Sequence, residues 1–253
     1  NNKNFLEKKN KYNFKIDIEE IHFNTEIIKE SHFSSCHYRI DVFKYLSKKK
    51  DYSALIDLDV VAVGEFSIKI EKIIDNNDAI FVNDITDNVI PAYGKEKIQK
   101  NLDLVLEERS DNRWYGGDIF FGHSKFYDEL HKSVSLTYNN FKKNFKILRD
   151  QTDELFISAG IELLKKNTKL NILDTRKYGI LDRYWSVNTK HQQDSFKKIK
   201  KNFLVHFPAD KVFLSNIAVN NFQCEIFLKN YEQYINSPKK KLKNLLSKIY
   251  SLI

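Results

Sequence analysis

Residues 52–61 read Tyr-Ser-Ala-Leu-Ile-Asp-Leu-Asp-Val-Val, an apolar run interrupted by two aspartates. Such a run is typical of a buried central strand that ends in acidic residues. Because residues two apart in an extended chain point to the same side, we expect Asp57 and Asp59 to face one point. Short acidic patterns also occur in solvated turns, but an unpartnered carboxylate pair at the end of an apolar strand is costly. The stretch therefore predicts a site for Mn²⁺ or Mg²⁺, which prefer carboxylate and phosphate oxygens.

The composition is that of a folded α/β protein. The chain has 253 residues, of which 42% are hydrophobic and 30% charged, and it contains 19 Phe and 13 Tyr but only 7 Gly and 3 Pro. These values exclude collagen-like and low-complexity proteins. The two cysteines, Cys36 and Cys224, form no Cys-x-x-Cys pair, which argues against a disulfide framework and a structural zinc site. The apolar runs are too short for a membrane span, so we expect a cytoplasmic protein.

The net charge of +8 is concentrated in lysine-rich runs at residues 8–11, 48–50, 197–201 and 239–243. Such runs suit anionic lipids, nucleic acid or nucleotide phosphates, although lysine runs are also common on solvated surfaces. The chain has no methionine and begins with Asn1. We therefore expect that the start of the native chain is missing or that methionines are omitted from the sequence.

Apolar periodicity predicts alternating strands and helices. Together they predict a mixed sheet flanked by helices, with a small helical segment at the C-terminus. The predicted strands are residues 14–23, 52–56, 66–74, 79–82, 114–122, 170–173 and 203–207, and the predicted helices are residues 38–46, 94–108, 125–131, 153–164 and 239–252.

A second polar group follows a late apolar strand. His206 closes the run at residues 203–207, and Lys211 lies five residues later. Imidazole is a ligand for Mn²⁺ and an ammonium group binds phosphate oxygens, so the pair suits a third metal ligand and a contact to a diphosphate. The alternative is a structural histidine beside a surface lysine.

Arg39 lies on the predicted helix before the strand that carries the two aspartates. A guanidinium group suits phosphate oxygens or a carboxylate of the motif. An ordinary ion pair on the helix surface is the alternative.

The stretch at residues 114–122 combines aromatic residues, two glycines and an aspartate. Gly116 and Gly117 permit close approach to the backbone, so a ligand could lie against them. Trp114 or Tyr115 would then stack on a sugar ring, and Asp118 would bind a donor or acceptor sugar. The alternative is a tight turn that leads into a core strand with aromatic packing.

Two acidic residues, Asp153 and Glu154, begin the predicted helix at residues 153–164. The helix dipole alone favours them there. The functional alternative is that one of them faces the anomeric carbon of a sugar as base, nucleophile or stabiliser of positive charge.

In their order along the chain, these motifs resemble those of bacterial GT-A glycosyltransferases, particularly the family 8-like enzymes that build lipopolysaccharide or capsular sugars. The resemblance covers residues 15–215 and lies in motif order rather than in long identical runs. It implies a GT-A (Rossmann-like) catalytic domain at residues 1–215 and a basic helical extension at residues 216–253. The implied roles are as follows: Asp57, Asp59 and His206 hold Mn²⁺ or Mg²⁺; Arg39, Lys211, Asp57, Gly116 and Gly117 bind the donor; Asp118, Asp153 and Glu154 orient sugars or act at the anomeric carbon.

Two features depart from that family. Its members begin with a strand and a loop that bind the nucleobase and ribose, and we find no such segment before residues 1–3, which agrees with a missing start. Around the glycine strand the family carries an Asn-Ser/Ala-Gly pattern, whereas residues 115–118 read Tyr-Gly-Gly-Asp. We therefore expect a different donor or acceptor sugar.

These observations predict a metal-dependent hexosyltransferase of cell-surface polysaccharide synthesis, with a nucleotide-diphosphate sugar as donor and a glycan or lipid-linked sugar as acceptor. Its basic terminal helix is expected to contact the anionic inner membrane. One alternative is a non-catalytic nucleic-acid-binding protein, suggested by the net charge of +8 but disfavoured because paired carboxylates repel phosphate. The other is a metal-dependent phosphohydrolase or nucleotidyltransferase, which would use the same carboxylates.

Overall fold

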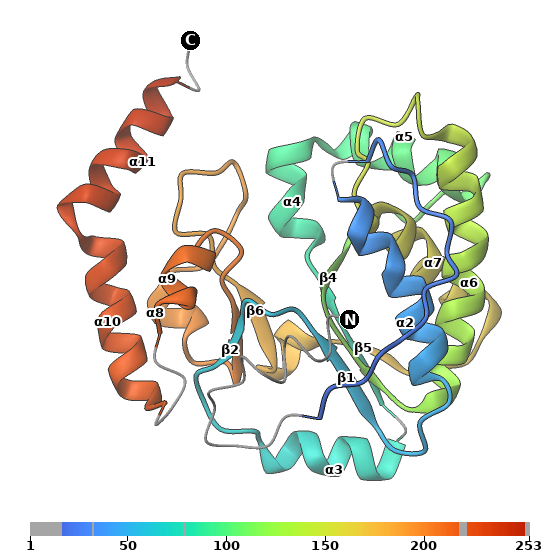
Figure 1. The fold of residues 1–253 in the computed structure, drawn as a ribbon, viewed down its shortest axis with the longest axis horizontal. Helices are drawn as coiled ribbons and strands as arrows, with labels where there is room; N and C mark the ends of the chain where they lie inside the picture. The colour runs from blue at the N-terminus through green and yellow to red at the C-terminus, as the bar shows by residue number, and fades with distance from the viewer. Residues whose placement is uncertain (1–16, 32, 78, 218–221, 251–253) are drawn as a thin grey trace.

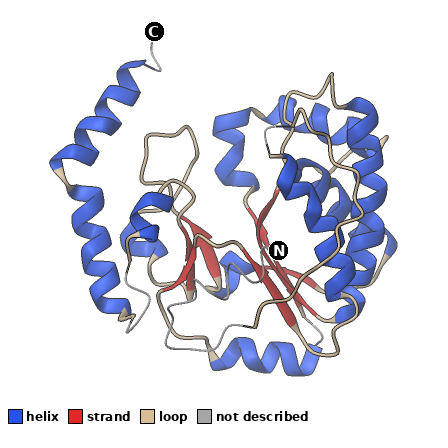
Figure 2. Ribbon diagram, in the orientation of Figure 1, coloured by secondary structure: helices blue, strands red, loops and turns tan. Residues whose placement is uncertain are grey.

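The computed structural model describes residues 17–31, 33–77, 79–217 and 222–250, and within them the chain is a mixed α/β protein whose sheets are flanked by helices (Figures 1 and 2). This confirms the predicted class. The elements are η1 Ser34–Tyr38, α2 Arg39–Leu46, β1 Ser53–Ile56, β2 Val60–Ala62, α3 Ile68–Asn77, β3 Ile80–Asp84, α4 Thr86–Tyr93, α5 Lys95–Leu106, β4 Tyr115–Gly122, α6 Ser124–Asn144, α7 Asp153–Asn167, β5 Ile172–Asp174, η2 Thr175–Tyr178, β6 Leu181–Arg183, α8 Phe196–Ile199, β7 Leu204–His206, α9 Lys211–Ser215, α10 Cys224–Asn236 and α11 Pro238–Tyr250.

The described strands form two sheets, and the first has the order β1-β4-β3-β5. Strand β4 is antiparallel to both β1 and β3, and β3 is parallel to β5. Strand β1 therefore lies at an edge, and its residues alternate between half-buried and exposed. The prediction of a central buried strand is wrong, because the apolar run contains one inward residue, Leu55, beside the outward-facing Ile56, which is 39% exposed.

The second sheet has the order β2-β7-β6. Strand β2 pairs antiparallel with β7, and β6 pairs parallel with it. The chain leaves β1 in the first sheet and enters β2 in the second through residues 57–59. The stretch with the two aspartates is thus the link between the two sheets (Figure 1).

The largest apolar core lies between the first sheet and helices α2, α5, α6 and α7. Helix α7 approaches α6 closely because residue 160 is glycine: a β-carbon there would lie 2.6 Å from Cγ2 of Val134. A second core packs β7 against α8 and α10, and a third packs α3 against both sheets. The third core therefore holds the two sheets together.

Two predicted strands are not strands. Residues 17–23 have no regular structure, and residues 14–16 lie outside the described part of the chain. The backbone that follows bonds to side chains instead of a neighbouring strand: the amides of Asn24 and Thr25 donate to Asp41 at 3.1 and 3.0 Å. Residues 66–74 mostly form α3, because Ile70, Ile73 and Ile74 also fit a helical spacing that covers the third core.

The C-terminal helices α10 and α11 lie on the side of the molecule opposite α6 (Figure 1). Helix α11 confirms the predicted terminal helix, whereas α10 was not predicted. Phe227 and Tyr231 of α10 belong to the same apolar core as Val205 of β7. The predicted division of the chain between residues 215 and 216 stays a prediction.

Candidate metal centre

The link between the sheets fixes both aspartates through backbone hydrogen bonds. The amide of Asp57 donates to the carbonyl of Asp118 on β4 at 3.1 Å, and the carbonyl of Asp59 accepts from the amide of Phe207 after β7 at 2.9 Å. Between them the side chain of Leu58 is fully exposed. One aspartate is therefore tied to the first sheet and the other to the second.

The three predicted metal ligands lie close together. Asp57, Asp59 and His206 each offer a ligand atom within 4.8 Å of the others. Strand pairing brings this about, because His206 stands opposite Val60 in the β2–β7 register and its Nε2 lies 3.2 Å from Oδ1 of Asp59. Two carboxylates and one imidazole could hold a divalent ion of the Mn²⁺ kind, with positions left for other oxygen ligands.

Asp118 orients His206. Nδ1 of His206 lies 3.0 Å from Oδ2 of Asp118, whose side chain is completely buried. Arg183 donates from Nε to the same oxygen at 2.5 Å, and Asn83 donates at 3.0 Å. Burial alone would raise the pKa of Asp118, but the charge of Arg183 and the contacts with His206 lower it. A carboxylate behind a ligating imidazole fixes the ring, so that Nε2 faces the metal position.

Two arginines connect the remaining carboxylates. Arg39 pairs with Asp57 and, through Nη1, with Asp153 at 2.8 Å. Arg183 pairs with Asp118 and, through Nη2, with Glu154 at 2.6 Å. The pair of Arg183 on β6 with Asp118 on β4 joins the second sheet to the first. The motif-contact alternative for Arg39 is thus the one the structure contains.

The charges in this network suit a divalent ion. Five carboxylates face three permanent cations, which leaves two negative charges when His206 is neutral. The third cation is Lys211, whose Nζ lies 3.4 Å from Oδ2 of Asp59 while its side chain stays 74% exposed. Burial raises the pKa of Asp59, but the hydrogen bond and charge of His206, with Lys211, lower it to about 2. Asp59 therefore offers an ionised ligand at any physiological pH.

The glycines leave room for the arginines. A β-carbon at Gly116 would lie 2.5 Å from Nη2 of Arg183, and one at Gly117 would overlap the guanidinium of Arg39. The space we assigned to a ligand beside β4 is therefore filled by two side chains of the chain itself. The glycines admit the two arginines, and a role for Gly116 and Gly117 in donor binding stays a prediction.

Neither aromatic residue before the glycines is available to stack on a sugar. Trp114 is 0% exposed and Tyr115 is 2% exposed. The indole of Trp114 donates to Oε2 of Glu154 at 2.9 Å and so helps to fix the position of that carboxylate. The stacking hypothesis is wrong, and the aromatic core packing of the alternative is confirmed, although Gly116 and Gly117 lie within β4 and not in a tight turn.

Asp153 and Glu154 begin α7 directly beside the arginines and differ in acidity. Burial and the neighbouring Glu154 and Asp57 raise the pKa of Asp153 to about 6 in spite of Arg39. Burial also acts to raise the pKa of Glu154, but the charge of Arg183 and the hydrogen bond from Trp114 lower it. Such a divergence gives neighbouring carboxylates different chemical roles.

Sequence reasoning missed Arg183 and Asn83. Arg183 ends β6 and Asn83 lies near the end of β3, and both are buried against Asp118. A lone arginine in a short strand carries no motif. The one signal in the sequence is that Arg183 is a charged residue at the end of a strand, as His206 is at the end of β7.

No helix in the described residues is long and apolar enough to cross a membrane. Comparison of the chain with protein-family models, with curated proteins and with solved structures returns no match.

Proposed function

We propose that this protein is a metal-dependent glycosyltransferase of the GT-A type, which transfers a hexose from a nucleotide-diphosphate sugar to a glycan or lipid-linked acceptor. One observation carries the proposal. All the site residues predicted from the order of the motifs, from Arg39 to Lys211, join a single network around Asp57, Asp59 and His206. A cluster of ionisable side chains with strongly shifted pKa values is typical of functional sites.

In this function Asp57, Asp59 and His206 would hold Mn²⁺ or Mg²⁺. The ion would supply Lewis-acid neutralisation of the departing diphosphate. Lys211, which pairs with Asp59 and is 74% exposed, would donate to a phosphate oxygen. Arg39 contributes by fixing Asp57, with which it is paired. Asp118, which is fully buried, is a positioning residue that orients His206 rather than a sugar ligand.

The sugar would lie beside the start of α7. Glu154 is the more acidic of the two carboxylates there and suits stabilisation of positive charge at the anomeric carbon. Asp153, with a pKa raised to about 6, suits proton transfer with the acceptor hydroxyl. These roles fit a transferase in which both groups face the same substrate.

Calorimetric titration of UDP and other nucleoside diphosphates, with and without Mn²⁺, tests the proposal. We expect Mn²⁺-dependent binding that is lost in Asp57→Ala/Asp59→Ala. The matched control is Asp128→Ala/Glu129→Ala, which removes a partly exposed acidic pair that forms ion pairs with Lys132 on α6. If the wild-type chain binds no nucleoside diphosphate in either condition, the proposal is wrong.

The paired carboxylates also suit a metal-dependent phosphohydrolase or nucleotidyltransferase. Product analysis separates these activities, because hydrolysis proceeds without a sugar acceptor. Nucleic-acid binding would appear instead as a salt-sensitive gel shift that Asp57→Ala leaves unchanged.

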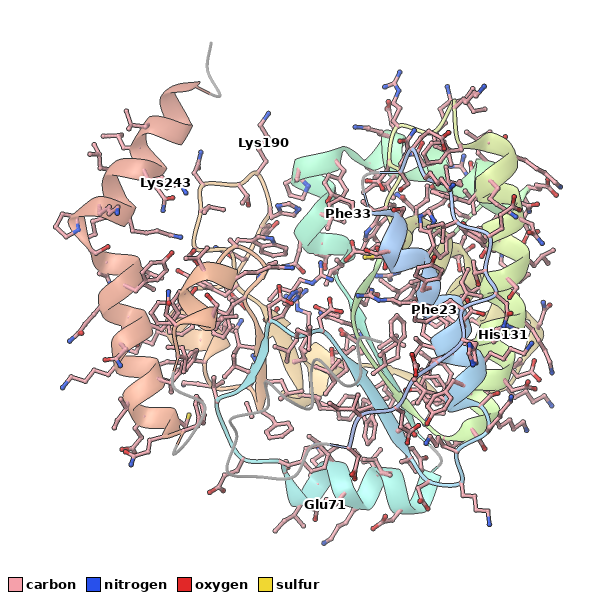
Figure 3. All side chains as sticks on the ribbon, viewed as in Figure 1. Phe23, Phe33, Glu71, His131, Lys190 and Lys243 are labelled. Atoms are coloured by element: carbon pink, nitrogen blue, oxygen red, sulfur yellow. The ribbon has the colours of Figure 1, made fainter. Side chains whose placement is uncertain are left out.

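We further propose that α11 contacts an anionic membrane surface, which would bring the site to a lipid-linked acceptor. Leu242, Leu245 and Leu246 are 57, 55 and 45% exposed. At helical spacing they form one outward face, and the exposed Lys241 and Lys243 flank it on its two sides. Figure 3 shows Lys243 on α11. An apolar face edged with lysines is the pattern of helices that lie in a lipid interface.

Cosedimentation with vesicles tests this contact. We expect binding to phosphatidylglycerol vesicles but not to phosphatidylcholine vesicles, and loss of binding in Leu242→Asp/Leu246→Asp. Binding of this double variant at the wild-type level would contradict the contact.

A further inference from the structure

The segment between His206 and Lys211 is held from the C-terminal helices. Asp210, directly before Lys211, has a completely buried side chain. Its Oδ1 accepts from Oγ of Ser186 at 2.6 Å, from Nζ of Lys240 at 2.9 Å and from the hydroxyl of Tyr234 at 3.1 Å. Its Oδ2 accepts from the hydroxyl of Tyr231 at 2.6 Å. One carboxylate thus ties the start of α9 to α10, α11 and the loop after β6.

Lys240 differs from Lys239, Lys241 and Lys243, the other lysines of α11 whose side chains are described. Its side chain is 6% exposed, whereas the side chains of Lys239, Lys241 and Lys243 are exposed. It also lies 3.0 Å from the hydroxyl of Tyr234. One turn further, Asn244 donates to the carbonyl of Ser186 at 2.9 Å. The inward face of α11 is therefore polar and contacts the same loop that contacts Asp210.

The ion pair is costly to break and fixed in geometry. Leaving one member of a buried pair without its partner is strongly destabilising. The backbone adds to the constraint, because the amide of Asp210 donates to the carbonyl of Phe207 at 3.1 Å and its carbonyl accepts from Leu214 of α9 at 2.9 Å. The position of the Asp210 side chain thus sets the direction in which α9 begins, and Lys211 is the first residue of α9.

The pair also bears on the charge around a bound phosphate. Without Lys240, the carboxylate of Asp210 would add a buried negative charge next to Lys211. A negative charge near a diphosphate opposes its binding, and a low-dielectric surrounding strengthens that effect. Lys240 thus both fixes the position of Lys211 and neutralises the charge of Asp210.

We propose that Lys240 of α11 is a positioning residue for the diphosphate site, acting through Asp210 to place the ammonium of Lys211 against a nucleoside diphosphate. The inference rests on the proposed function, since it assumes that Lys211 meets a diphosphate. It gives the C-terminal helices a role in substrate binding that is separate from any lipid contact, because Lys240 lies on the face of α11 opposite the exposed leucines.

The test compares two titrations on the full chain: Mn²⁺ alone, and UDP in saturating Mn²⁺. In Lys240→Met we expect UDP affinity to fall about tenfold, near the lower bound for losing one charge-assisted hydrogen bond. Mn²⁺ affinity should not fall, because Lys240 contacts none of the three metal ligands and its removal takes positive charge away from the site. The matched control is Lys229→Met on α10, which removes an exposed lysine and should change neither affinity.

A double-mutant cycle separates positioning from general support of the fold. If Lys240 acts through Lys211, then Lys240→Met should cause a smaller loss of UDP affinity in the Lys211→Met background than in the wild-type chain, and the remainder reflects the unpaired charge of Asp210. Ser186→Ala removes a different hydrogen bond to Asp210 and leaves no buried charge without a partner. It should also lower UDP affinity. This variant replaces Lys240→Met in the test if Lys240→Met fails to fold.

Three results would overturn the inference: unchanged UDP affinity in folded Lys240→Met, additive losses in the cycle, or, if Lys240→Met does not fold, unchanged UDP affinity in Ser186→Ala. Each of these leaves the proposed function standing when the wild-type chain binds UDP with Mn²⁺. Failure of the wild-type chain to bind UDP would instead overturn the proposed function and this inference together.

Discussion

The buried carboxylate behind His206 offers the sharpest test of the metal centre. Asp118→Asn keeps the shape of the side chain and removes its charge. An asparagine oxygen in the place of Oδ2 still accepts from His206 and Arg183, which lie 3.0 and 2.5 Å away. Its amide nitrogen would face Nδ2 of Asn83 at the 3.2 Å now measured to Oδ1. Asn83 can turn its amide, because its own oxygen has no hydrogen-bond partner in the described structure.

The substitution therefore changes charge more than packing. Arg183 keeps Glu154 but loses one buried partner, for which we expect a loss of about 3–5 kcal/mol in the free energy of unfolding. Removal of a carboxylate behind a ligating histidine lowers metal affinity by about 10- to 100-fold. Mn²⁺ titration measures the second effect, and urea unfolding measures the first.

The control is Asp128→Asn, which changes an exposed aspartate that pairs with Lys132 on α6. It should leave both quantities at the wild-type level. A folded Asp118→Asn protein with wild-type Mn²⁺ affinity would refute the reasoning, because it would show that His206 needs no orienting carboxylate or is not a ligand.

Three further outcomes are expected from the same network. Mn²⁺ at about 100 times its Kd should raise Tm by roughly 5–10 °C in a scanning calorimeter, and Asp57→Ala/Asp59→Ala should abolish the rise; an equal rise in the variant would place the ion elsewhere. Burial lowers the pKa of His206, but hydrogen bonds to Asp118 and Asp59 raise it above its ordinary 6.5. Because Mn²⁺ needs the unprotonated Nε2, its affinity should keep rising with pH above that value, and His206→Gln should flatten the profile; a flat wild-type profile would exclude His206 as a ligand. Gly117→Ala should displace Arg39 and cost about 1–3 kcal/mol in urea unfolding, whereas wild-type stability would show that Arg39 has another place to lie.

The spacing of apolar residues predicted helices and strands accurately where it fitted only one of the two periods. The helix expected at residues 94–108 is α5, and the helix expected at residues 153–164 is α7. The pattern was ambiguous at residues 66–74, where apolar residues fit both periods. It also could not place β1 at an edge of its sheet, because hydrophobicity does not encode which strand is the neighbour.

The candidate site shows the same division. Charge and chemical type marked Asp57, Asp59 and His206, since few environments other than a metal site suit such residues at the ends of apolar strands. The buried partners were missed, because Arg183 acquires its role only by meeting Asp118, 65 residues away in the sequence. Trp114 and Tyr115 were misassigned, because an aromatic ring packs equally well against a sugar and in an apolar core, and the sequence does not distinguish the two.

By itself, the sequence determined the mixed α/β class and the ligand types of the candidate metal centre, because both follow from periodicity and side-chain chemistry that neighbouring residues already carry. The tertiary structure decided which groups meet. It filled the space at Gly116 and Gly117 with the two arginines, buried Trp114 beneath Glu154, and tied Lys240 to the residue before Lys211. Those contacts join strands and helices from two sheets, and their energies depend on burial and distance, which exist only once the chain has folded.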